Sequence, residues 1–306
     1  MIGLCSCSAD DGDDNNDDGA DDASDEMGDE EPVDERVQMP ADDPMRINFA
    51  GPEFVVKPGE DAIMCMHLAY EGPEVVYNNA ISLQGKGGHH VIVLGAKEPK
   101  APGTLEDCSD GADMSKYDLL MIPQELPAGY GTILPAGRRF VIQSHYVNTT
   151  DKPLLVRDVV QLAKIPAESV VHWAAPLATN TIAVELPAGE KTEITFDCTL
   201  ENDVELLMLG GHMHEWGTKF EASLGATVDT LEPLYLVDPW QADFRDVPPV
   251  NLYLQEPKPL KAGTVLRTHC EWDNTEAEMI KFPHEMCATF GIVGGTKDPI
   301  ECRHGE

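Results

Sequence analysis

The chain has 306 residues and a formal net charge of −34, from 55 acidic and 21 basic side chains. This length is sufficient for two domains of ordinary size. The acidic balance argues against a nucleic-acid partner, because binding to phosphates requires a basic surface. No run of residues is long and apolar enough to predict a membrane-spanning helix.

The first 43 residues carry much of the negative charge. They contain 17 acidic residues and a single basic one, Arg36, so this segment holds −16 of the total. A segment with this self-repulsion and no apolar periodicity is predicted to be a disordered, extended tether. We assign residues 1–44 to it, as a signal remnant followed by the acidic tether.

Two cysteines lie at the start of the chain, in MIGLCSCSADDGDD. A short apolar stub, a small residue, Cys7 and a polar tether resemble the end of a bacterial lipoprotein signal, although Leu4–Cys7 is an imperfect lipobox. A true start codon upstream would supply the missing charged and apolar parts. Cys7 is therefore a candidate for lipidation and for a membrane tether. The alternative is a secreted protein with a trimmed signal.

The other six cysteines are dispersed and form no C-x-x-C motif. An even, dispersed set predicts disulfides, and hence export to an oxidising compartment. The candidate locations are periplasmic, extracellular and lipid-anchored at an outer membrane. Reduced, buried cysteines are the alternative.

From Met45 onward the pattern predicts an all-β protein. Segments rich in Val, Ile, Leu and Thr alternate with Gly and Pro turns, which is typical of antiparallel β-sandwiches or barrels. The clearest segments are residues 53–61, 89–103, 126–147, 182–198, 203–214 and 260–272. The turn, strand and cysteine of residues 57–66 are similar to those of residues 187–198. We therefore predict two domains, 45–170 and 171–306.

The H-x-H motif His212–His214 is the first candidate metal site. Residues i and i+2 of a strand point to the same face, so both imidazoles can bind one ion. The motif follows an apolar run and Gly210–Gly211, so it lies where a strand meets a bend. H-x-H also occurs in cupins, and a chance surface pair is the alternative without a metal.

The adjacent pair His89–His90 is the second candidate. Neighbours on a regular strand face opposite ways, so one ion can bind both only if the backbone is distorted. Gly87 and Gly88 provide the freedom for a bulge. A buried structural pair is the alternative.

Two further residues complete the inventory of candidate ligands. His145 lies on a predicted strand with Gln143 on the same face, where Gln143 could hydrogen-bond a ligand or solvent. Met286 precedes Cys287 and offers a thioether, although an isolated methionine is usually a core residue. We assign His284 and Glu285 to a turn. The histidines without a partner at ligand spacing are interpreted as structural: His67, His172, His269 and His304.

In order and type, these motifs resemble the copper type II, ascorbate-dependent monooxygenases. The matching elements are His-His, Q-x-H-Y, H-x-H and E-M-C, and they extend over roughly residues 50–305. Together the motifs are quite specific, although each one alone is not. The resemblance implies two tandem antiparallel jelly-roll β-sandwich domains, each with one copper ion.

The resemblance also implies the roles of the ligands. His89, His90 and His145 would bind an electron-transfer copper, and His212, His214 and Met286 would bind the catalytic, oxygen-activating copper. The reaction would hydroxylate an aliphatic C–H bond of a small molecule or peptide with O2 and electrons from ascorbate or a similar donor. The implied disulfides are Cys65–Cys108, Cys198–Cys302 and Cys270–Cys287.

Two positions depart from the peptide-hydroxylating members of the family. Gly210 stands where those enzymes have an arginine for the substrate carboxylate, and Phe290 stands where they have a tyrosine. An apolar or neutral substrate is therefore the better expectation.

Two other hypotheses remain open at this point. One is an exported copper-binding or electron-transfer protein on the same scaffold. The other is a cupin-like metalloenzyme that uses only the H-x-H site.

Overall fold

Strands make up nearly all the regular structure of the computed structural model, which describes residues 31–109 and 116–305. The helices whose bounds lie entirely within these ranges are short 3-10 turns, η2 (Ala167–Ser169) and η3 (Ala242–Arg245). The all-β prediction is confirmed, as expected for short β-branched segments separated by Gly and Pro turns. In the described residues, no helix is long and apolar enough to cross a membrane.

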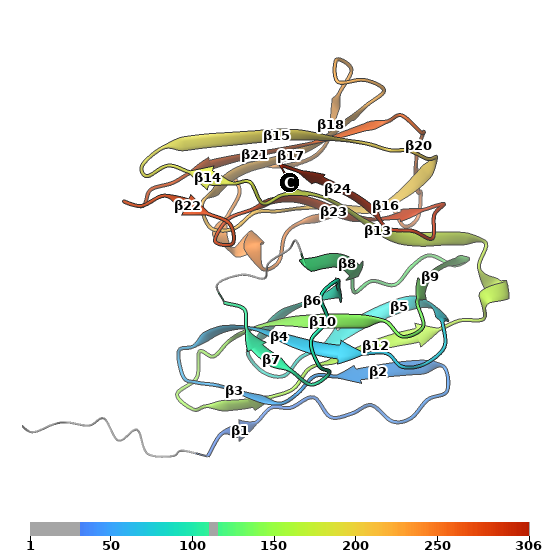
Figure 1. Cartoon of the computed structure of the whole chain (residues 1–306), viewed down its shortest axis with the longest axis vertical. Helices are drawn as coiled ribbons and strands as arrows, with labels where there is room; N and C mark the ends of the chain where they lie inside the picture. Colours follow the sequence, from blue (N-terminus) through green and yellow to red (C-terminus); the bar gives the residue numbers. More distant parts are fainter. Residues whose placement is uncertain (1–30, 110–115, 306) are drawn as a thin grey trace, which may run out of the picture. The chain divides into compact units, whose positions relative to one another are not determined.

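The histidines of the first half lie on a five-stranded antiparallel sheet of order β7–β4–β10–β6–β8 (Figure 1). Its strands are β7 (Leu105–Asp107), β4 (Asp61–Ala69), β10 (Arg139–Val147), β6 (Gly88–Ala96) and β8 (Tyr117–Met121). On β10, Phe140 and Ile142 enter the main core of this half. Side chains alternate along a strand, so Gln143 and His145 are presented on the opposite face of the sheet.

A second, ten-stranded sheet passes through both halves of the chain (Figure 1). Its main path is β19 (Val250–Leu252), β16 (Val204–His212), β23 (Cys287–Gly294), β13 (His172–Thr181), β9 (Tyr130–Leu134), β5 (Val75–Leu83), β12 (Val159–Lys164) and β2 (Arg46–Ala50). β20 (Lys258–Leu260) pairs with β16, and β24 (Ile300–His304) pairs with β13.

The outer sheet of the second half has the order β15–β21–β17–β18. Its strands are β15 (Lys191–Thr199), β21 (Val265–Asp273), β17 (Gly217–Gly225) and β18 (Glu232–Val237). Two small sheets complete the structure: β14 (Glu185–Leu186) with β22 (Ile280–Lys281), and β1 (Val33–Asp34) with β11 (Leu154–Val156) and β3 (Phe54–Val56).

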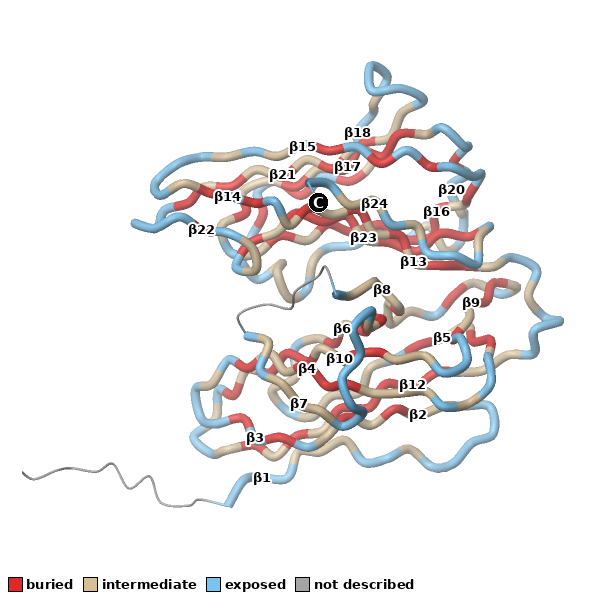
Figure 2. The backbone as a smooth tube through the Cα atoms, viewed as in Figure 1, coloured by how far each residue is buried: buried red, intermediate tan, exposed pale blue. Residues whose placement is uncertain are grey.

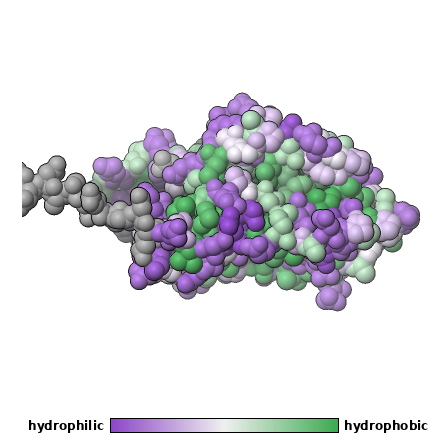
Figure 3. Space-filling view, turned by 90° about the horizontal axis from the view of Figure 1, so that it is seen from below, coloured by the Kyte–Doolittle hydropathy of each residue, from purple (hydrophilic) through white to green (hydrophobic). Residues whose placement is uncertain are grey.

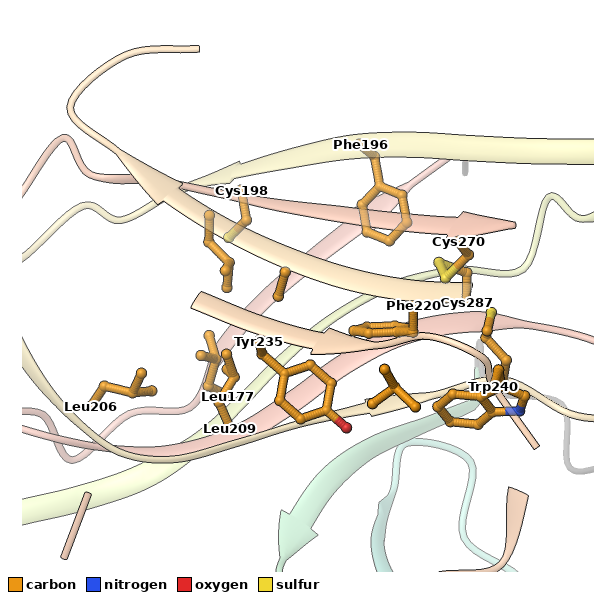
Figure 4. Packing of buried hydrophobic residues seen from close by; sticks show 14 of the residues in the cluster. Leu177, Phe196, Cys198, Leu206, Leu209, Phe220, Tyr235, Trp240, Cys270 and Cys287 are labelled. Carbon is orange, nitrogen blue, oxygen red and sulfur yellow. A yellow bond between two sulfur atoms is a disulfide. The ribbon is translucent and has the colours of Figure 1, made fainter. Parts of the chain in front are cut away.

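Each half has its own large buried cluster, and a smaller cluster contains residues of both. The cluster of the first half includes Tyr77 and Phe140. In the second half, Phe220 lies 5.7 Å from Tyr235 and 6.2 Å from Trp240, measured between ring centroids (Figure 4). Buried positions follow the strands, whereas the connecting turns are mostly exposed (Figure 2). Packed sheets around such cores are a β-sandwich architecture.

The predicted boundary at residues 170 and 171 falls between η2 and β13, but the ten-stranded sheet continues across it. His172 and Trp173 at the start of β13 pair in parallel with Tyr130 and Gly131 of β9. By its internal contacts, Pro32–Glu306 is a single unit. The division into domains 45–170 and 171–306 with two jelly-rolls therefore stays a prediction.

The acidic tether predicted over residues 1–44 is too long at its C-terminal end. Residues 1–30, including Cys5 and Cys7, lie outside the described part of the chain, but Val33 and Asp34 form β1 against β11. Arg36 then donates to both carboxylate oxygens of Glu53, each at 2.9 Å. The lone basic residue of the acidic segment thus helps to attach its end to the sheet.

All six described cysteines are paired, which confirms the prediction of disulfides. The pairs are those implied by the resemblance: Cys65–Cys108, Cys198–Cys302 and Cys270–Cys287. Three disulfides are compatible with an exported protein in an oxidising compartment. The face shown in Figure 3 carries both hydrophilic side chains and apolar patches.

Candidate functional site

A β-bulge brings the adjacent pair His89–His90 to His145. In the pairing of β10 with β6, His145 lies opposite His90 but Tyr146 lies opposite Gly88, so His89 is the extra residue. Gly87 has φ +84°, a conformation that favours glycine. The ring centroids of His89 and His90 each lie 5.1 Å from that of His145. The predicted bulge is therefore present, and the three imidazoles form one group.

Two carboxylates flank His145, which is almost fully buried. Its Nε2 lies 2.6 Å from Asp61 Oδ1, and its Nδ1 lies 3.1 Å from Asp246 Oδ1. Burial lowers the pKa of His145, but the two carboxylates outweigh it and the pKa is raised. A ring held at one nitrogen by a carboxylate is typical of a metal-binding histidine, whose other nitrogen faces the ion.

The H-x-H motif lies at the end of β16. The rings of His212 and His214 have centroids 5.1 Å apart, and His214 Nδ1 donates to the carbonyl oxygen of His284 at 2.7 Å. This hydrogen bond leaves Nε2 of His214 free for a ligand. Burial lowers the pKa of both imidazoles, which keeps them neutral as metal binding requires.

Glu285 connects the H-x-H segment to Met286. Its Oε1 accepts hydrogen bonds from the backbone N–H of His214 at 2.7 Å and of Met286 at 2.8 Å. The side chain is fully buried, and burial raises its pKa to about 8. The assignment of Glu285 to an ordinary turn is therefore wrong, because the two segments that carry His214 and Met286 converge on its carboxyl group. His284 does lie in the turn.

Residues of both candidate sites line one cavity of about 380 Å³. His90 and Gln143 reach it from the first half of the chain, and His212, His214 and Met286 reach it from the second half. Gln143 therefore faces the same space as the predicted ligands. The other polar lining residues are Ser109, Asn180, Glu215, Arg245, Asp246, His284 and Thr289.

Much of the cavity wall is apolar. Ile92, Leu94 and Met121 line it on one side, and Phe282 and Phe290 line it on the other. Arg245 is the one arginine or lysine among the described lining residues, and it pairs with Glu215. The described wall thus offers no unpaired cation to a substrate carboxylate.

The two positions that depart from the peptide-hydroxylating pattern are in contact. Gly210 of β16 lies opposite Phe290 of β23 in the strand pairing. A Cβ atom at Gly210 would lie only 2.6 Å from Cζ of Phe290. The phenyl ring therefore occupies the space into which a side chain at position 210 would extend.

The donor atoms of the two groups fit copper. Three imidazoles suit a borderline ion, and two imidazoles with a thioether suit Cu(I), because soft sulfur favours the reduced state. Two polar atoms of the first group, His90 Nδ1 and His145 Nδ1, are buried without a hydrogen-bond partner in the described chain. Unpaired buried nitrogens are costly unless a ligand satisfies them.

The sequence patterns missed three acidic residues of this region: Asp61, Asp246 and Glu285. Asp61 and Asp246 belong to none of the motifs, and each reaches the histidines only through the fold. Glu285 had one signal in the sequence, because it is the glutamate of the E-M-C motif and immediately precedes Met286.

The remaining histidines make contacts that agree with a structural role. His67 pairs with Glu106, His172 stacks on Tyr130, and His304 stacks on Phe196. His269 lies close enough to Glu193 and Glu271 to share an ion, but its nitrogens already contact Thr195 and Glu271. Lys219 also donates to Glu271 at 3.1 Å and supplies the compensating charge.

No protein-family model matches the chain, and no curated protein matches it. Among solved structures, it is similar to the STIV MCP at 7% identity and a TM-score of 0.27, over 81% of this chain and 96% of that chain. It is also similar to the infectious bursal disease virus VP2 subviral particle at 8% identity and a TM-score of 0.20, over 85% and 74%. TM-scores this low carry no argument about function.

Proposed function

We propose that the protein is an exported, copper-dependent monooxygenase that hydroxylates an aliphatic C–H bond. The observation that carries the proposal is that residues of two chemically different donor groups line the same cavity. A protein that only stores or carries copper has no need of a large apolar cavity beside its metal ligands. This cavity favours the enzyme over the electron-transfer protein on the same scaffold.

His89, His90 and His145 would hold one copper, and His212, His214 and Met286 would hold the other. Copper supplies electron transfer at the first site and O2 activation at the second when bound. The chain's own groups orient the ligands: Asp61 holds His145, the carbonyl of His284 holds His214, and Glu285 holds the backbone next to Met286. Gln143 lies at the cavity wall, where it can hydrogen-bond solvent or substrate.

The reaction balances with ascorbate or a similar donor as the reductant. One oxygen atom of O2 enters the C–H bond, and the other leaves as water with two electrons and two protons. The apolar lining excludes bulk water from the reacting carbon, which limits side reactions. The substrate is a small molecule or peptide that enters the cavity.

The substrate class that fits the cavity is neutral and apolar. Phe290 covers Gly210, so the wall presents a phenyl ring where a cationic anchor would otherwise extend. An apolar pocket of this kind gains affinity from buried carbon surface rather than from ion pairing. A substrate with a free carboxylate would lose hydration without gaining a partner.

The proposed location is a periplasmic, extracellular or outer-membrane site, in the last case through a lipid on Cys7. The three disulfides support the export, because they persist in oxidising compartments. The lipid tether can be checked by mass spectrometry of the mature N-terminus from its native host.

The first test is the copper content of the desalted, copper-loaded protein. We expect two ions per chain, followed by ascorbate-dependent O2 consumption and hydroxylation of neutral apolar compounds in preference to their carboxylates. Met286→Ala should retain one copper and lose turnover, because its thioether belongs to the second site. Met279→Ala is the matched control, since Met279 is half-exposed and is not one of the candidate ligands.

Different outcomes separate the competing functions. Two coppers without an ascorbate-driven product in a broad substrate screen would favour the carrier. One copper that survives replacement of His89, His90 and Met286 would favour the cupin-like enzyme. Normal turnover of both Met286→Ala and His145→Ala would overturn the assignment of the ligands.

A further inference from the structure

Asp246 is the polar residue of the cavity that the ligand motifs leave unexplained. It follows η3 in the second half of the chain, yet its carboxylate faces the three histidines of the first half. Asp246 Oδ1 lies 3.1 Å from His145 Nδ1 and 3.7 Å from His90 Nδ1. Asp246 Oδ2 lies 3.7 Å from His89 Nδ1.

These distances are the ones that ligand atoms of a shared ion show. Metal bonds of about 2.0–2.2 Å place neighbouring ligand atoms about 3–4 Å apart. His145 Nδ1 and Asp246 Oδ1 are close but are not aligned as a hydrogen bond. Both atoms, and His90 Nδ1 with them, are buried without a hydrogen-bond partner in the described residues.

We propose that Asp246 is a fourth ligand of the metal at the three-histidine site. The site then takes ligands from both halves of the chain, so that binding of the ion fastens the segment after η3 to the first half. The inference rests on the proposed copper function of the same histidines. A carboxylate is a harder donor than imidazole or thioether, so it favours Cu(II) over Cu(I) at this site.

Other charges near Asp246 provide the competing explanation. Arg245 Nε lies 3.7 Å from Asp246 Oδ1, and Arg245 also pairs with Glu215. If Asp246 only balances protonated histidines and Arg245, its loss leaves the affinity for Cu(II) unchanged. If Asp246 is a ligand, its loss lowers the affinity of the site for Cu(II) much more than the affinity for Cu(I).

The segment that carries Asp246 is held by partly buried contacts: the Phe244 ring lies 5.6 Å from that of Trp240, and Arg245 pairs with Glu215. No residue of η3 is buried, and Val247 is 67% exposed. Few buried contacts mean a low local stability, so backbone amides in such a segment exchange readily with solvent. A metal bond from Asp246 would therefore slow hydrogen exchange there when Cu(II) is added.

The test compares Asp246→Asn with Asp243→Asn in a His212→Ala background, so that only the three-histidine site binds copper. Asp243 is an exposed residue of the same segment and serves as the matched control. We expect Asp246→Asn to lower the affinity for Cu(II) at least about 10-fold, as measured by competition with a chelator. The affinity for Cu(I) should fall less. Its Cu(II) electron paramagnetic resonance spectrum should change as well, and Asp243→Asn should match the parent.

Hydrogen exchange provides the second readout. Cu(II) should protect the backbone amides of residues 242–247 in the parent and not in Asp246→Asn or Asp246→Ala. Unchanged Cu(II) affinity, spectrum and protection in both variants would overturn the inference while leaving the proposed function intact. If the unsubstituted protein hydroxylates no substrate while Asp246→Asn still weakens Cu(II) binding, the proposed function alone is rejected.

Discussion

At the scale of single residues, buried hydrogen-bond acceptors decide how the candidate ligands are held. Glu285 Oε1 accepts hydrogen bonds from the backbone N–H groups of both His214 and Met286, and the Glu285 side chain is fully buried. Its raised pKa keeps the carboxyl group protonated near neutral pH, so a glutamine is a close substitute. The side-chain oxygen of Glu285, as a hydrogen-bond acceptor, thus stabilises the fold, and a negative charge on it is not required.

We predict that Glu285→Ala lowers the free energy of unfolding of the metal-free protein by about 2–5 kcal/mol, because two buried N–H groups lose their acceptor. Glu285→Gln retains a side-chain oxygen and should cost about 1 kcal/mol or less. Urea unfolding followed by circular dichroism measures both. Equal losses in the two variants would contradict the role of this oxygen.

At the scale of elements, the pairing of β10 with its neighbours sets the position of His145. The strand is fixed from its core side by Asp158, which accepts hydrogen bonds from Ser144 and Tyr146. Asp158 is fully buried, and burial outweighs these hydrogen bonds and raises its pKa. One buried carboxyl group thus holds the residues on both sides of the histidine.

The raised pKa of Asp158 predicts a pH dependence of stability. The folded protein keeps this proton to a higher pH than the unfolded chain, so unfolding releases a proton. The stabilising contribution is therefore full below about pH 4, the value for unfolded aspartate, and is lost as the pH rises through the raised pKa. We expect the metal-free protein to lose stability over that range.

Asp158→Asn removes this titration and keeps a hydrogen-bonding side chain of the same size. Urea unfolding of the metal-free protein between pH 4 and pH 8 should show a shallower loss of stability in this variant than in the parent. An exposed control is Asp151→Asn, which should follow the parent. A parallel pH profile in all three proteins would reject the assignment.

At the scale of the whole molecule, disulfides link strands that are distant in sequence. Cys198–Cys302 joins β15 to β24 over 104 residues, and Cys270–Cys287 joins β21 to β23 over 17 residues. The longer loop restricts the unfolded chain more, so its bridge is expected to stabilise the fold more. The shorter bridge adjoins Met286 and thus also affects the candidate site.

We predict that replacing Cys198 and Cys302 by alanine lowers the free energy of unfolding by about 5 kcal/mol without changing the copper content. Replacing Cys270 and Cys287 should cost about 3 kcal/mol and reduce binding at the Met286 site. Chemical unfolding and elemental analysis measure these effects. Loss of both coppers from the Cys198 and Cys302 variant, with its fold intact, would contradict the separation of the two roles.

The sequence by itself determined the β architecture and most of the candidate ligands. Alternation along residues 139–147 predicts that Gln143 and His145 share a face, and the glycines before His89 predict its bulge, because both are properties of neighbouring residues. The even number of dispersed cysteines predicts disulfides, because composition alone indicates an oxidising compartment. Which cysteines pair came only from the resemblance.

Only the tertiary structure decided which residues meet around these ligands. Asp246 lies 101 positions after His145, and Glu285 lies 71 positions after His214, so no local pattern relates either pair. The parallel pairing of β13 with β9, the contact of Gly210 with Phe290 and the shared cavity are likewise long-range. Side-chain spacing encodes the face of a strand, whereas the packing of separate strands decides what that face touches.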